Sequence, residues 1–156
     1  MERTFRGREW IASHSDLWWD LLRIYLGIAL FIKGYVYLHD VAALVAMMRA
    51  SGAPFATPFF AEVAALLHVG GGLMLAFGLF TRIAAAIQIP NLLGAVFFIH
   101  LKQGLFTPGQ TLELATLVLV ILVLLVCGGA GRYSIDWYFV QRTPAPGPTP
   151  RPLRAG

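Results

Sequence analysis

Titratable side chains interrupt four long apolar stretches of this 156-residue chain. They are Arg23, Lys33, Glu62, His68 and Glu113. Each of them costs about 3 kcal/mol or more inside a bilayer, so such residues mark either a functional pocket or a buried ion pair. A proton-accessible pocket of this kind suits a lipophilic redox molecule or an anionic substrate.

Two side-chain amides, Gln88 and Asn91, extend this polar set along the third apolar stretch. At 100° per residue they share one stripe of a helix with small residues. His68 shares a face with glycines and alanines, which let helix backbones approach closely in lipid, so this face is expected to point inward. We therefore predict a polar interior pocket of His68, Lys33, Gln88 and Asn91, with a lipophilic redox molecule or an anionic substrate as its candidate ligand.

The same charges also permit a purely structural interpretation. Lys33, Glu62 and Glu113 fall at similar depth, so Lys33 can pair with either carboxylate and fix the register of the helices. Arg23, Glu62 and Glu113 are accordingly assigned structural roles. The sequence leaves this interpretation and the binding pocket open.

Other chemistries lack the residues that they need. Cys127 is the sole cysteine, which excludes an internal disulfide and a Cys-x-x-Cys redox pair. A b-type haem needs histidines at matching depth on facing helices. His68 lies near the middle of its stretch and His100 near an end, so neither haem nor another metal is expected. The basic residues lie at helix ends rather than in a patch beside aromatic residues, so nucleic acid is not an expected partner.

The elements that must position these residues are four apolar stretches, at residues 17–38, 59–80, 83–101 and 112–127. A bilayer core about 30 Å thick takes roughly 20 helical residues to cross. Hydrophobic residues make up 58% of the chain and charged residues 13%, which fits lipid as the main surrounding. We predict an all-α integral membrane four-helix bundle over residues 1–139, followed by a Pro-rich, disordered tail over residues 140–156.

The segment between the first two spans predicts a short interfacial helix over residues 40–51. Asp40 can cap its start, and Val41, Leu44, Val45 and Met48 recur at helical spacing. A dozen residues cannot cross the bilayer, so this helix is expected to lie on the outer face.

The basic residues at the span ends predict the orientation of the bundle. Eight arginines fall before the first span, in the turn between spans two and three, or after the last span: Arg3, Arg6, Arg8, Arg82, Arg132, Arg142, Arg151 and Arg154. The other two connections hold only Arg49 and Lys102. The positive-inside rule therefore places both termini in the cytoplasm. The expected location is a bacterial cytoplasmic (inner) membrane.

Three groups of residues resemble the DoxX family of small four-helix membrane proteins. They are Arg23 with Gly27 and Gly34, then Gly71-Gly72-Leu73 with Gly78-Leu79-Phe80-Thr81-Arg82, and finally Gly129-Ala130-Gly131-Arg132-Tyr133-Ser134-Ile135-Asp136. The resemblance runs from about residue 20 to residue 139. Many members of the family carry His where this chain has Lys33. The resemblance implies a membrane protein linked to quinone-coupled sulfur oxidation or to membrane oxidoreductase complexes.

The last of these groups is expected to be structural. Asp136 can accept hydrogen bonds from Arg132 or from Arg82, and so clasp the helix ends together. Two functions follow from the sequence as a whole. The first is an accessory or quinone-interacting subunit that associates with other membrane redox subunits. The alternative is a non-catalytic carrier or scaffold for a lipophilic molecule, a partner protein or a second copy of the chain.

Overall fold

The computed structural model describes residues 15–104 and 111–142, and every regular element in these ranges is helical. Four helices are long and apolar enough to cross a membrane: Asp16–His39, Pro58–Phe77, Thr81–His100 and Thr111–Gly128. The predicted all-α bundle of four spans is therefore confirmed. Arg3, Arg6, Arg8, Arg151 and Arg154 lie outside the described residues.

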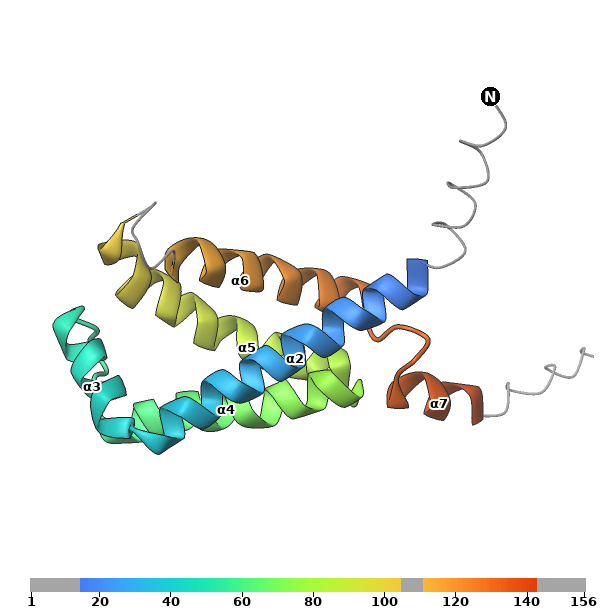
Figure 1. Ribbon diagram of the computed structural model, residues 1–156, viewed down its shortest axis with the longest axis horizontal. Helices are drawn as coiled ribbons and strands as arrows, with labels where there is room; N and C mark the ends of the chain where they lie inside the picture. The colour runs from blue at the N-terminus through green and yellow to red at the C-terminus, as the bar shows by residue number, and fades with distance from the viewer. Residues whose placement is uncertain (1–14, 105–110, 143–156) are drawn as a thin grey trace, which may run out of the picture.

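The described chain contains six α-helices, one short π-helix and one short 3₁₀ turn. They are α2 (Ser15–His39), α3 (Val41–Ala50), α4 (Pro58–Phe77), α5 (Thr81–Ala95), the π-helix η1 (Val96–His100), the 3₁₀ turn η2 (Leu101–Gln103), α6 (Thr111–Gly128) and α7 (Ile135–Arg142). Helix α2 packs along α4, α4 packs on α5, and α5 packs on α6. Figure 1 shows α3 at one end of this bundle and α7 at the other, where α2 begins.

Glycines bring α2 and α4 into close contact. A Cβ atom added at Gly72 would lie 2.5 Å from the Phe31 backbone nitrogen, and one at Gly34 would lie 2.6 Å from the Val69 nitrogen. A Cβ atom at Gly27 would overlap the backbone of Ala76. In lipid, where apolar surface gains little from association, such backbone proximity is what holds helices together. This contact carries His68 into the interior on α4.

The predicted short helix between spans one and two is present as α3. The Asp40 carboxylate accepts a hydrogen bond from the Ala43 amide at 2.8 Å, as an N-cap does. Leu44, Val45 and Met48 are buried against Ala61 and Ile99, at the end of the bundle opposite α7.

Two predicted boundaries are wrong. Span two ends at Phe77 rather than at residue 80, because Gly78 adopts the left-handed conformation with φ of 67° and Phe80 follows with φ of 46°. The predicted tail does not begin at residue 140, because α7 continues to Arg142. Residues 143–156 of that tail lie outside the described residues.

Candidate functional site

Helices α4 and α5 bring three of the predicted pocket residues together. His68 comes from the middle of α4, and Gln88 and Asn91 come from successive turns of α5. His68 and Gln88 are buried, and Asn91 is half-buried. We call these three side chains the α4–α5 cluster.

Asn91 joins the two helices through a carbonyl group. Its Nδ2 lies 3.2 Å from the Ala64 carbonyl oxygen and 2.9 Å from His68 Nδ1, which itself lies 2.8 Å from the same oxygen. In one tautomer, Nδ1 carries the proton and donates a hydrogen bond to the Ala64 carbonyl oxygen. In the other, the proton resides on Nε2, and Nδ1 accepts a hydrogen bond from Asn91 Nδ2. The described residues supply no hydrogen bond to Nε2. This ring nitrogen is therefore available as donor in one tautomer and as acceptor in the other.

Gln88 adds a buried acceptor to the cluster. Its Nε2 donates to the Leu67 carbonyl oxygen at 2.9 Å and packs against Gly71. Its Oε1 is buried and has no hydrogen-bond partner among the residues that the structure describes. An unpaired buried acceptor costs about 1–3 kcal/mol, so a donor at this position, from a ligand or a water, would be stabilised.

Lys33 does not belong to the interior pocket that the sequence predicts. It is exposed, and its Nζ lies 5.1 Å from the centre of the Tyr37 ring. Tyr37 in turn meets His68 edge-on, with ring centres 5.8 Å apart. Gly34 faces α4, so its neighbour Lys33 lies about 100° around the helix and points outward. Tyr37 thus lies between Lys33 and the cluster.

The predicted ion pair of Lys33 with Glu62 or Glu113 is also wrong. Lys33 and Glu62 are both exposed, and no ion pair within 4 Å joins Lys33 to either carboxylate among the described residues. Glu113 lies in the first turn of α6. The ion pair that does form inside the bundle involves a different acid.

A second buried cluster surrounds Arg23 at the α7 end of the bundle. Arg23 and Asp20 are almost fully buried and pair at 2.9 Å. The guanidinium also donates to the carbonyl oxygens of Leu75, Ala76 and Tyr133. Asp20 accepts from the Tyr133 amide at 2.9 Å. Arg23 thus ties α2 to the end of α4 and to the segment before α7.

Asp136 clasps the same end of the molecule, but not through the predicted partners. Its carboxylate accepts from the backbone amides of Phe80 at 2.7 Å and Thr81 at 2.8 Å, where α5 begins. Arg132 instead lies 3.3 Å from Asp16, and Arg82 lies 3.4 Å from the Cys127 carbonyl oxygen. The start of a helix has unsatisfied amides and a positive dipole end, and both stabilise this carboxylate.

Asp20 is the functional residue that the sequence reasoning missed. The spacing Asp20-x-x-Arg23 puts both side chains on one helix face, and this spacing was the signal for the pair. The Trp19 Nε1 donates to the Gly129 carbonyl oxygen at 3.0 Å. No sequence pattern predicts that contact, because it joins residues 110 positions apart.

Two cavities lie at the ends of the bundle rather than at the α4–α5 cluster. One, of about 620 Å³, is lined by Val41, Ala42, Val45, Ala46, Arg49 and Pro58. The other, of about 370 Å³, lies beside α7. No group of three or more His, Cys, Asp or Glu side chains that could hold a metal occurs among residues 15–104 and 111–142. Cys127 is an exposed free thiol.

Comparison with known proteins gives a family for this architecture. The DoxX family model matches residues 18–101, which include Arg23 and the whole α4–α5 cluster. A protein of Haemophilus influenzae described only as uncharacterized is 36% identical over 83 residues, or 51% of this chain and 62% of the relative. The protein named "Putative oxidoreductase CatD" of Bacillus subtilis is 32% identical over 82 residues, or 53% of this chain and 59% of the relative. The aligned part therefore spans about three fifths of these relatives. No solved structure matches the chain.

Proposed function

Because the chain belongs to the DoxX family of membrane proteins, we propose that it is an accessory, quinone-interacting subunit of a membrane redox system. The α4–α5 cluster is the proposed quinone site. The name of the Bacillus subtilis relative supports an oxidoreductase context. The protein holds the quinone in a bacterial cytoplasmic membrane, with both termini in the cytoplasm, and partner subunits exchange the electrons.

The buried His68 with its available Nε2 is the observation that carries this proposal. A quinone presents two carbonyl oxygens that accept hydrogen bonds, and the quinol presents two hydroxyl groups that donate them. The Nε2–H tautomer of His68 suits the first state, and the Nδ1–H tautomer suits the second. The unpaired Gln88 Oε1 adds an acceptor for a quinol hydroxyl.

The quinone content of the purified protein tests the proposal. Extraction of the full chain in mild detergent, followed by mass spectrometry of bound lipids, should detect quinone in near-stoichiometric amount. His68→Ala and Asn91→Leu should lower that content about tenfold, the loss expected from a charge-free hydrogen bond plus the shape of the site. His39→Ala is the matched control, because His39 is an exposed histidine at the end of α2.

The scaffold alternative is favoured by one specific observation. Gln88 and Asn91 both donate to carbonyl oxygens of α4, so they fasten α5 to α4 whether or not a ligand binds. If the cluster serves only this purpose, His68→Ala and Asn91→Leu lower the melting temperature while quinone is absent from every variant. Quinone in the wild-type protein at equal content in all variants would place the ligand elsewhere and contradict the proposed site.

A further inference from the structure

Helix α7 is held firmly against the end of the bundle. The Asp136 carboxylate caps α5, and the Asp136 amide donates to the Gly78 carbonyl oxygen at 3.0 Å. The Ser134 hydroxyl donates to Gly131 and accepts from the Trp137 amide at 3.1 Å, which caps α7 itself. These bonds fix the position of α7 relative to the end of α4. The surface between the two helices is therefore preformed.

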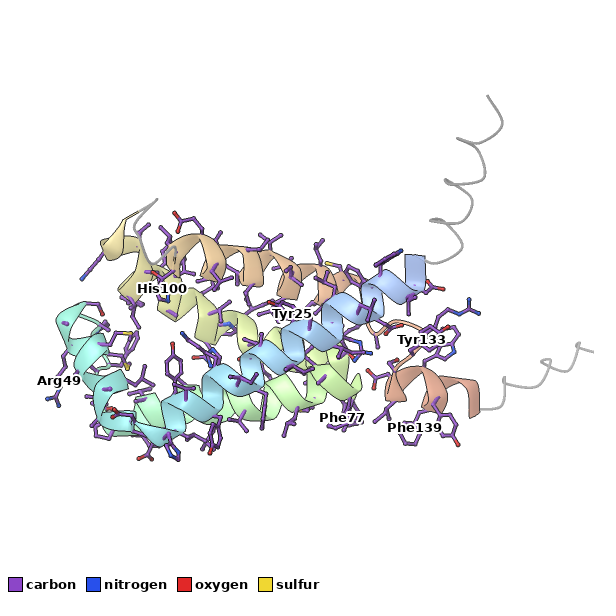
Figure 2. All side chains as sticks on the ribbon, in the orientation of Figure 1. Tyr25, Arg49, Phe77, His100, Tyr133 and Phe139 are labelled. Atoms are coloured by element: carbon purple, nitrogen blue, oxygen red, sulfur yellow. The ribbon has the colours of Figure 1, made fainter. Side chains whose placement is uncertain are left out.

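An open cavity of about 370 Å³ lies between the end of α4 and α7, and we call it the α7 groove. Its lining includes Phe77, Arg132, Tyr133, Ile135, Trp137 and Tyr138. Figure 2 shows Phe77, Tyr133 and Phe139 together at this end of the molecule. The exposed fractions of Phe77, Tyr133 and Phe139 are 63%, 70% and 60%. An exposed aromatic set of this kind is typical of the layer where lipid headgroups meet acyl chains.

Arg132 gives the α7 groove a positive charge. Its side chain is 64% exposed, and its guanidinium lies 5.8 Å from the centre of the Trp137 ring. Asp16 is its ion-pair partner at 3.3 Å, through a single nitrogen of the guanidinium. An exposed pair of this length is weak, and the remaining guanidinium donors can bind a second anion.

We propose that the α7 groove binds the phosphate headgroup of an anionic phospholipid from the leaflet at this end of the bundle. Arg132 would bind the phosphate through two parallel N–H donors, because the planar guanidinium group matches the spacing of phosphate and carboxylate oxygens. Trp137 and Tyr138 would flank the headgroup. The inference is independent of the quinone site.

Continuity with the exposed face of α4 favours a lipid over a soluble partner. Phe77 lines the groove, and the apolar side chains of Leu73 and Leu66 follow it along α4, exposed by 40% and 57%. A bound lipid can thus place its headgroup beside Arg132 and its acyl chains along a face that is already in lipid. A soluble protein on the groove could not extend along that face into the bilayer.

Lipid titration of the detergent-purified full chain, followed by native mass spectrometry, tests the proposal. Phosphatidylglycerol should bind more tightly than phosphatidylcholine. Arg132→Gln should weaken phosphatidylglycerol binding about fivefold, as expected for one basic residue at a membrane surface. Phosphatidylcholine binding should fall by less, because its choline group offsets the charge of the phosphate. Asp16→Asn should act in the opposite direction, since it removes the competing carboxylate.

Arg49→Gln is the matched control, because Arg49 is an exposed arginine at the α3 end of the bundle. This variant should bind phosphatidylglycerol like the wild type. Equal affinity of the wild type and Arg132→Gln for phosphatidylglycerol would overturn the proposal, and so would equal binding of the two lipids by the wild type. If a partner protein rather than a lipid occupies the α7 groove in the cell, the wild type and Arg132→Gln are expected to bind phosphatidylglycerol with equal affinity.

Discussion

At the residue scale, the Arg23–Asp20 pair is a buried ion pair that links three segments of the bundle. Removal of one partner from a buried pair leaves the other charge without compensation, which costs about 3–5 kcal/mol. We expect Arg23→Leu to lower the free energy of unfolding by that amount, measured by denaturant or SDS titration in detergent. The exposed Arg132–Asp16 pair supplies the control, and Arg132→Leu should cost about 1 kcal/mol or less.

The double replacement separates charge from packing. Arg23→Leu combined with Asp20→Leu removes both charges, so it should recover part of the stability lost in Arg23→Leu alone. Equal unfolding midpoints for Arg23→Leu and Arg132→Leu would show that the Arg23 pair contributes no more than a surface contact.

Asp136 supports a second prediction at this scale. Because its carboxylate satisfies two amides at the start of α5, Asp136→Ala should lower the unfolding free energy by about 1–2 kcal/mol. Asp136→Asn retains one acceptor oxygen and should lose about half as much. Circular dichroism melts in detergent measure both. An Asn variant less stable than the Ala variant would contradict the capping role.

At the scale of elements, the close contact of α2 with α4 predicts opposite outcomes for two glycines. A Cβ atom at Gly34 would lie 2.6 Å from the Val69 backbone nitrogen, whereas one at Gly70 has no neighbour within 4 Å. Gly34→Ala should therefore destabilise the bundle by about 1–3 kcal/mol. Gly70→Ala should be neutral or stabilise it by up to about 1 kcal/mol, the difference in helix propensity. Thermal melts of the two variants, compared side by side, decide whether backbone proximity holds this helix pair.

The helices were predictable from the sequence because their signals are local. Apolar length identified all four spans, and the Asp40 cap with its apolar periodicity identified α3. Helix α7 was not predicted, because its eight residues are stabilised by contacts with Gly78 and the start of α5 rather than by their own pattern.

The candidate site was predictable only where helix faces decide it. Small neighbours correctly brought His68, Gln88 and Asn91 to one interior surface. Depth along the chain placed Lys33 beside Glu62, but depth does not fix rotation, and both side chains point outward. The partners of Asp136 are backbone amides, which no residue type in the sequence marks as available.

At the scale of the whole molecule, the two ends of the bundle differ in their chemistry. The start of α2, the α4–α5 turn and α7 lie at one end, where Arg82 and Arg132 are exposed (Figure 1). Helix α3 and the turn η2 lie at the other end, with Arg49 and Lys102. The excess of arginines in the segments that meet at the α7 end supports the proposal that this end faces the cytoplasm.

Single-cysteine labelling of intact bacterial cells tests this orientation. In a Cys127→Ser background, Ala50→Cys at the end of α3 should react with a membrane-impermeant maleimide, since α3 faces outward in the proposed topology. Tyr138→Cys on α7 should react only after the cells are permeabilised. Both positions are exposed, so access by the reagent, not burial, decides the result. Reversed labelling would show that the bundle has the opposite orientation in the membrane. The phosphate that Arg132 binds would then belong to the outer leaflet, because the packing of the four spans does not depend on their orientation.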